Sequence, residues 1–379
     1  MSKTQWYYQE RRNAQAGATG SATFDLPEKG FLPQVNLTVA STPLAVTNPA
    51  IPIADQLTRI EIIDGGNVIK SLTGNQVKAL AAYWGIQNIA TQEGQLTAVE
   101  TYDWFPLQLG ALIDGINYAP DMSQFSNPQL RVTWDCSITT TRFGMVCDAI
   151  TTPAMKFSLL CEMIRDSKSY QHGYIKSTIL KEFTQVVSTQ QTIDVPRGRP
   201  LLGLGIEAGY AAKLFYNDVA EIELNMDNGA WVPFHFYAEE INLAQMLWFK
   251  QSFRYAWNAA MVNAKVIDPH MGYPVWLGVT SNLATGEQCM IPLSRVGGIT
   301  LNDFDLATPT AIAAYNVKQF CVSGWEPFHL WYCPMRQIQA DEEDSLDTSA
   351  FNNITLKVTS DASASTSMKP EIIAEVLMT

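Results

Sequence analysis

The segment Thr23-Phe24-Asp25-Leu26-Pro27 has a closely related second copy in this chain, Thr192-Ile193-Asp194-Val195-Pro196. A second segment is repeated in the same order: residues 125–137 share seven of thirteen positions with residues 351–363. Ordinary residue frequencies would give about one identity over that length. Self-similarity at a domain-sized spacing, in two copies only, predicts two similar domains in tandem.

Each copy has the pattern of a series of short β-strands. In the first copy Val35, Leu37 and Val39 alternate with polar residues, which is typical of a strand with one buried face. Segments 60–66 and 222–229 match each other and end in Asp-Gly or Asn-Gly pairs, which accept the positive φ of tight hairpin turns. Many short strands between turn signals favour a sandwich over a parallel sheet. We therefore expect an all-β chain with short helices, folded as two tandem jelly-roll β-sandwiches.

Each copy also contains one segment with helical spacing. Apolar residues at positions i, i+3, i+4 and i+7 predict an amphipathic helix. The first copy has Val77, Leu80, Ala81 and Trp84, and the second has Ile241, Ala244, Gln245 and Trp248 at the matching positions.

The repeat predicts domain boundaries. We expect the first jelly roll with its connecting segment over residues 21–188 and the second over residues 189–379. The second copy is longer between its helix and its last strand, which predicts a surface tower over roughly residues 249–324. Residues 1–20 are polar, carry Arg11-Arg12 and lack the apolar core of a signal peptide. We expect them to form an N-terminal arm, helical at most over its first dozen residues, that becomes ordered on a partner.

The composition limits the possible partners. A net charge of −12 repels nucleic acid, so we expect no specific nucleic-acid partner. No apolar run is long enough to span a bilayer. Charged residues make up only 16% of the chain, which predicts a lightly charged surface that other subunits cover.

The cysteines show no tight framework spacing. In a chain with adequate hydrophobic cores they are most simply reduced thiols from cytoplasmic synthesis. They are Cys136, Cys147, Cys161, Cys289, Cys321 and Cys333.

Metal-binding patterns are weak. Cys321, His329 and Cys333 give the best zinc spacing, but they lack a fourth ligand, so ordinary strands with buried thiols are favoured. Asp303-Phe304-Asp305 could form a calcium loop, against the simpler interpretation of a solvated turn. The run 341–344 is interpreted as a solvated loop, with cation or basic-partner binding as the alternative.

Catalytic patterns are equally scarce. Residues 203–209 superficially resemble a dinucleotide loop, but they align with the first strand of copy one and do not open a helix. No nucleophile has a partnered base. We expect no catalytic residue, no cofactor and no metal, and therefore no enzyme.

The doubled turn, followed each time by a strand, a hairpin and a helix, resembles the major capsid proteins of the double jelly-roll lineage. That lineage includes capsid proteins of tailless icosahedral viruses, often with an internal membrane, and of adenoviruses. The matching turns are residues 23–32 and 192–201, and the resemblance covers roughly residues 21–363.

The resemblance implies a structural role in the virion. It implies a homotrimeric capsomer with a pseudo-hexagonal footprint, loops that form outward towers, and an N-terminal arm near the inner face or an internal lipid membrane. The implied neighbours are other capsomers, penton proteins and minor capsid proteins, after synthesis and assembly in the host cytoplasm.

Two other functions compete with this one. A viral receptor-binding or carbohydrate-binding β-sandwich, such as a spike or tail protein, would place exposed aromatic side chains in one groove, most simply in the insertion. A bicupin enzyme would need metal-binding histidines at strand spacing, and the four histidines of the chain are too scattered to supply two such sites.

Overall fold

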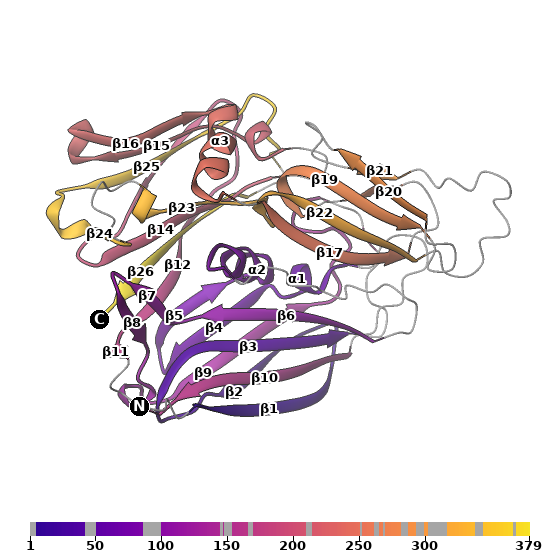
Figure 1. Ribbon diagram of the computed structural model, residues 1–379, viewed down its shortest axis with the longest axis vertical. Helices are drawn as coiled ribbons and strands as arrows, with labels where there is room; N and C mark the ends of the chain where they lie inside the picture. Colours follow the sequence, from indigo (N-terminus) through magenta and orange to yellow (C-terminus); the bar gives the residue numbers. More distant parts are fainter. Residues whose placement is uncertain are drawn as a thin grey trace, which may run out of the picture.

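The computed structural model shows a β-rich chain in which two sandwiches lie one above the other (Figure 1). The structure describes residues 5–41, 51–85, 100–144, 147, 154–165, 170–209, 214–250, 252–260, 265–267, 270–281, 287–292, 299–301, 317–337, 344–366 and 369–379.

The first jelly roll is a sandwich of two four-stranded sheets. One sheet has the strand order β1-β10-β3-β6, and the other has the order β2-β9-β4-β5. The strands of the first sheet are β1 (Gln5–Ala16), β10 (Ala154–Ile164), β3 (Phe31–Ser41) and β6 (Thr101–Gln108), and those of the second are β2 (Thr19–Asp25), β9 (Pro128–Asp135), β4 (Arg59–Asp64) and β5 (Asn67–Leu72).

The second jelly roll repeats this arrangement strand for strand. Its sheets have the orders β12-β26-β14-β23 and β13-β25-β15-β16. The strands are β12 (Tyr174–Glu182), β26 (Glu371–Met378), β14 (Pro200–Glu207), β23 (Leu330–Pro334), β13 (Gln190–Asp194), β25 (Ile354–Ser360), β15 (Val219–Met226) and β16 (Trp231–Tyr237). The predicted double jelly roll is confirmed.

The described residues include three α-helices beside the sandwiches: α1 (Ile53–Gln56), α2 (Gly74–Tyr83) and α3 (Ala238–Trp248). Figure 1 shows α1 and α2 between the two jelly rolls, whereas α3 lies on the second jelly roll away from the first. Of the described helices, none is long and apolar enough to cross a membrane.

Short elements complete the two jelly rolls. They are β7 (Ala111–Ile113), β8 (Ile116–Ala119), β11 (Gln171–His172) and β24 (Leu346–Asp347), with the 3-10 helices η1 (Met122–Gln124), η3 (Phe215–Asn217), η4 (Asp227–Gly229), η5 (Met335–Gln337) and η6 (Thr348–Ala350).

The second jelly roll carries additional strands between α3 and β23. One sheet has the order β17-β22-β19-β20, and β18 pairs with β21. The strands are β17 (Phe253–Ala260), β18 (Lys265–Ile267), β19 (Met271–Ser281), β20 (Glu287–Pro292), β21 (Ile299–Leu301) and β22 (Val317–Pro327). They occupy most of the range in which we expected an insertion.

Two large hydrophobic clusters fill the described part of the chain: one lies in the second sandwich, and the other fills the first sandwich and continues into residues of β17, β22 and β23. Along β9, Leu130, Val132 and Trp134 point into the first core, while Arg131 and Thr133 alternate with them on the outer face. The corresponding strand β25 contributes to the second core in the same way. Burying each Val or Leu side chain contributes about 1.5–3 kcal/mol, so this alternation fixes the register of both sheets.

The prediction that residues 1–20 form an arm ordered by a partner is wrong for residues 5–16. Residues 5–16 form β1, which pairs antiparallel with β10. Trp6 and Tyr8 pack against the first core, while Tyr7 and Arg11 face outward. The polar outward-facing residues hid the alternation that marks a strand.

The expected boundary at residue 188 also differs from the strand pairing. Strand β12 forms the edge of a second-domain sheet as β1 does in the first domain, and it pairs with β26 along its length. A single parallel pair, Ser177 with Lys70, joins it to β5 of the first jelly roll, so β2-β9-β4-β5 and β12-β26-β14-β23 are two halves of one continuous sheet. Strand β12 therefore belongs to the second jelly roll, although we placed it in the first domain.

Gly74 allows the close contact between α1 and α2. A Cβ atom at Gly74 would lie 2.3 Å from the backbone oxygen of Ala54. We expect Gly74→Ala to lower the free energy of unfolding by about 1–3 kcal/mol, because the backbone of α1 must shift. Urea unfolding followed by circular dichroism measures the change.

Gly66→Ala is the matched control for this substitution. A Cβ atom at Gly66 has no other atom within 4 Å. The control should change the free energy of unfolding by less than about 0.5 kcal/mol. Equal unfolding midpoints for the two variants would contradict the packing role of Gly74.

Candidate assembly surface

Helix α2 is buried between the two jelly rolls. The side chain of Thr73 accepts a hydrogen bond from the backbone N–H of Gln76, and the Gln76 side chain accepts one from the backbone of Thr73, which together form a capping box. Every residue of α2 except Ala82 is buried. A helix with polar residues on a buried face requires polar partners, and the second jelly roll supplies several of them.

Gln76 reaches two carboxylates of the second jelly roll. Its Nε2 donates to Glu207 Oε2 at 2.5 Å and also to Glu371 Oε2. Arg142 binds the opposite oxygens of the same pair, at 3.2 Å from Glu207 Oε1 and 3.2 Å from Glu371 Oε1. The two glutamates face each other on β14 and β26. One amide and one guanidinium therefore hold two buried carboxyl groups together.

This environment changes the ionisation of Glu207. Burial raises the pKa of its carboxyl group to about 7, against the opposing charge of Arg142 and with a further upward contribution from Glu371. Asp55 lies in the same cluster, where its Oδ1 accepts hydrogen bonds from Asn75 and from the backbone N–H of Arg142.

Lys78, two residues after Gln76 in α2, is also buried. Its Nζ lies 2.5 Å from Asp103 Oδ2, and both side chains are fully buried. The ammonium also lies 5.3 Å from the ring centroid of Tyr255 and 5.4 Å from that of Phe328, both of which belong to the second half of the chain. These cation–π contacts and the ion pair compensate for the burial of the charge.

Glu375 makes a second polar connection between the jelly rolls. Its carboxylate accepts hydrogen bonds from Trp84 at 2.9 Å, Ser177 at 2.6 Å and Tyr332 at 2.9 Å. Lys70 Nζ lies 3.8 Å from the same carboxylate. Burial lowers the pKa of Lys70, although Glu375 opposes this change. The first jelly roll is thus joined to the outer face of the sheet β12-β26-β14-β23.

Helix α3 occupies the corresponding place in the second jelly roll, but its outer face is exposed. Ile241, Ala244 and Gln245 pack inward, as the helical spacing predicts. Leu243 is 54% exposed and Leu247 is 68% exposed. Leu247 takes the position that the buried Tyr83 has in α2. On α2 this helix face is buried against the second jelly roll. On α3 no described residue covers the equivalent face.

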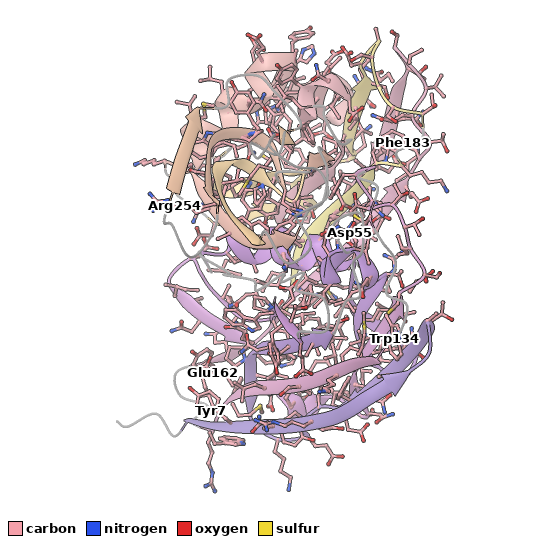
Figure 2. All side chains as sticks on the ribbon, turned by 90° about the vertical axis from the view of Figure 1, so that its right-hand side faces the viewer. Tyr7, Asp55, Trp134, Glu162, Phe183 and Arg254 are labelled. Atoms are coloured by element: carbon pink, nitrogen blue, oxygen red, sulfur yellow. The ribbon has the colours of Figure 1, made fainter. Side chains whose placement is uncertain are left out.

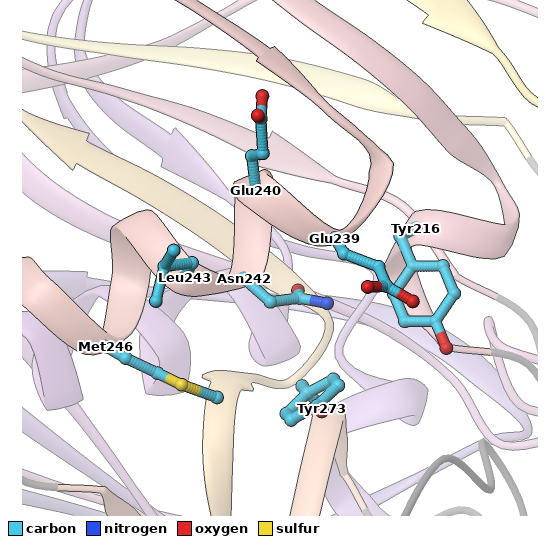
Figure 3. Close-up of a pocket in the computed structure, with 7 residues that line it drawn as sticks. All are labelled: Tyr216, Glu239, Glu240, Asn242, Leu243, Met246 and Tyr273. Atoms are coloured by element: carbon cyan, nitrogen blue, oxygen red, sulfur yellow. The ribbon is translucent and has the colours of Figure 1, made fainter.

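A pocket of about 370 Å³ lies beside α3, lined by Tyr216, Glu239, Glu240, Asn242, Leu243, Met246 and Tyr273. Figure 3 shows Asn242 extending from the helix toward Glu239 and Tyr216, with Tyr273 and Met246 below it. Asn242 is only 3% exposed, and neither polar atom of its amide has a hydrogen-bond partner. It takes the position of Lys78 in α2, which the second jelly roll encloses. A buried amide without a hydrogen-bond partner is uncommon in folded proteins, and this one lies in the wall of the pocket.

The outer face of the sheet β1-β10-β3-β6 is the second uncovered surface. It exposes four large apolar side chains, Tyr7, Tyr102, Trp104 and Leu160. Figure 2 shows Tyr7 and Glu162 at the far end of the first jelly roll, away from Asp55 at its junction with the second.

The counterpart of this sheet face is buried. Residues Thr38 and Ser158 pair on the first sheet as Glu207 and Glu371 do on the second. The first pair is partly exposed, whereas the second pair lies under α2. Strands β14 and β26 are consequently buried on both faces. The outer sheet face of the second jelly roll is therefore covered by α2, whereas no described residue covers the equivalent face of the first jelly roll.

Among the described residues, the zinc and nucleotide candidates are not brought together as sites. Cys321 is exposed on β22 whereas His329 and Cys333 are buried, and the three are not grouped at ligand distance. Residues 203–207 lie inside β14, where a Cβ atom on Gly203 would meet the ring of Tyr332, so this glycine serves close packing. Asp303-Phe304-Asp305 and residues 341–343 lie outside the described residues.

Sequence reasoning found both helices but missed the difference in their surroundings. The signal was present in the aligned helix positions, where Gln76 and Lys78 of α2 correspond to Glu240 and Asn242 of α3. A lysine on a helix face with apolar neighbours indicates a buried partner, which the second copy does not repeat.

The pKa of Glu207 predicts a pH dependence of stability. Because the folded-state pKa of about 7 lies above the ordinary value of 4.5, the protonated carboxyl favours the folded state. This contribution is fully present below about pH 4.5 and is lost as the pH rises through about 7. We expect Glu207→Gln, which stays neutral, to remove that part of the decline, as measured by urea unfolding from pH 4.5 to 8.

Glu28→Gln is the control, because Glu28 lies exposed in a turn. It should preserve the wild-type pH profile. A Glu207→Gln profile parallel to that of the wild type would show that Glu207 does not titrate in this range.

Neither a protein-family model nor a curated protein sequence matches this chain. Solved structures do match it along nearly its whole length. The STIV MCP crystal structure gives a TM-score of 0.58 at 9% identity and covers 98% of this chain and 96% of that chain. The PBCV-1 virus capsid gives 0.52 at 9% identity, with 100% and 95% covered. The major capsid protein P2 from bacteriophage PM2 gives 0.50 at 9% identity, with 99% and 97% covered. The chain has the double jelly-roll fold of these viral capsid proteins.

Proposed function

We propose that this chain is the major capsid protein of an icosahedral virus and forms homotrimeric capsomers with a pseudo-hexagonal outline. The likeness to capsid structures over nearly the full length of both chains supports the class of protein. The observation that carries the proposal is the mismatch within the repeat: α2 is covered by a jelly-roll sheet, while α3 and the outer face of β1-β10-β3-β6 are not.

The two uncovered surfaces are complementary by the symmetry of the repeat. In one chain, α2 of the first jelly roll lies on the outer sheet face of the second. We propose that α3 of the second jelly roll lies in the same manner on the outer face of β1-β10-β3-β6 in the next copy. Such a contact joins two different surfaces, so copies assemble head to tail until the ring closes. Closure after three copies leaves no α3 face uncovered.

Further elements follow from the same proposal. The strands between α3 and β23 form the outward tower, and the capsomers contact each other, penton proteins and minor capsid proteins in the virion. Synthesis and assembly take place in the host cytoplasm. Residues 5–16 are a strand of the first jelly roll. We therefore do not propose that they contact an internal membrane.

The proposed role is structural and includes no catalysis. Buried thiols support this, since burial raises the pKa of Cys136 to about 11 and that of Cys161 to about 12. A thiol that stays protonated at neutral pH is a poor nucleophile.

The proposed interface predicts the behaviour of two single variants. Leu243→Glu places a charge on the α3 face, and Leu160→Glu places one on the outer sheet face. Both residues are exposed in the single chain, at 54% and 37%, so both variants should keep the fold. We expect the wild type to sediment as a trimer and each variant as a monomer, because the charge is buried unpaired on assembly.

Mixing the two variants tests whether the surfaces meet head to tail. The Leu160→Glu chain keeps an intact α3 face and the Leu243→Glu chain keeps an intact sheet face, so the mixture should form a one-to-one dimer that cannot close. Val187→Glu, at an exposed turn, is the control and should stay trimeric. A monomeric wild type, or trimeric Leu243→Glu, would refute this interface.

A further inference from the structure

Two carboxylates and one imidazole converge on the outer face of the sheet β13-β25-β15-β16. Glu223 on β15 lies directly opposite His235 on β16, and Glu221 lies two residues along on the same face of β15. One ligand atom from each residue lies within 4.8 Å of the others. The side chains of Glu221, Glu223 and His235 are 23%, 14% and 34% exposed, so solvent and ions can reach the group.

Neighbouring donors orient both carboxylates. Thr359 Oγ1 donates to Glu221 Oε2 at 3.1 Å. Lys357 Nζ and Asn225 Nδ2 donate to Glu223 Oε1 at 2.7 Å and 2.9 Å. The remaining oxygens face His235: Glu221 Oε1 contacts Nε2, and Glu223 Oε2 lies 3.9 Å from it. Outer hydrogen bonds that fix one carboxylate oxygen and leave the other free are typical of metal-ligating carboxylates.

The first jelly roll provides an internal comparison. There Glu61 corresponds to Glu223. Glu61 pairs with Arg131 at 2.6 Å, as Glu223 pairs with Lys357. Glu61 also accepts a hydrogen bond from Ser71, which takes the place of His235. Strand pairing places Ser71 opposite Glu61 and Arg59 two residues from it. The second copy has His235 in place of the serine and Glu221 in place of the arginine. The second copy thus has residues that can ligate a metal at both positions, and the first copy has them at neither.

We propose that Glu221, Glu223 and His235 bind a first-row divalent transition-metal ion, with Zn²⁺ as the test ion. Imidazole nitrogen and carboxylate oxygen are suitable ligands for such ions, and three protein ligands leave positions for water or for a ligand from another molecule. The ion would lie between His235 Nε2 and the Glu221 carboxylate, which contact each other directly here. This site does not depend on the proposed capsid function.

Isothermal titration with ZnCl₂ on the full-length assembled protein tests the site. His235→Ala should lose one equivalent of bound Zn²⁺ per chain relative to the wild type. Glu221→Gln should weaken binding at that equivalent by about tenfold or more. Zn²⁺ should also raise the unfolding temperature of the wild type but not that of His235→Ala at matched concentration.

Glu61→Gln is the matched control, since it removes the equivalent carboxylate of the first jelly roll. It should keep the wild-type stoichiometry and affinity. All variants are compared with the wild type in the same buffer, so zinc bound by cysteine thiols is common to each titration. A wild type that binds no Zn²⁺, or a His235→Ala variant with unchanged stoichiometry, would overturn the proposal.

Discussion

The enclosure of charged groups between the two jelly rolls is the constraint on which the rest of the structure depends. The buried carboxylates of Glu207 and Glu371 meet Gln76 and the half-buried Arg142 of the first half of the chain, and the buried Glu375 meets Trp84 and Lys70. Buried charges are costly unless each has a partner in the correct position. The two sandwiches are therefore held in one relative orientation, since sliding would leave carboxylates without donors.

The two helices of the repeat differ in their surroundings: α2 is buried against the second jelly roll, whereas one face of α3 is exposed. Within the chain, α2 provides polar residues that the opposing sheet satisfies. At the other end, α3 presents Leu243, Leu247 and the unsatisfied amide of Asn242. Exposed apolar patches often mark interaction sites, and buried unsatisfied polar groups are uncommon in folded proteins. A duplicated fold that satisfies only one of its two helix contacts internally is suited to association with further copies of itself.

The sequence predicted the architecture well because duplication is visible without coordinates. The repeated turns, the alternation along β9 and β25, and the matched helices identified the sandwiches and their order. The edge strands could not be found in this way. Strand β1 carries outward polar residues such as Gln9 and Arg11, and its assignment depends on pairing with the distant β10. The proposed assembly surface was not found from the sequence, because burial of Lys78 and exposure of Leu247 depend on which faces meet, and local pattern does not determine that.

Strand β26 has a consequence for how the protein is made. It lies between β12 and β14 and bonds to both, although the whole of the second jelly roll separates it from β12 along the chain. Until translation reaches residue 378, β12 and β14 present open hydrogen-bonding edges beside an already formed first sandwich. Such edges template aggregation, and contacts between distant segments form slowly. The sheet of the second jelly roll can therefore close only after the last strand of the chain has been made.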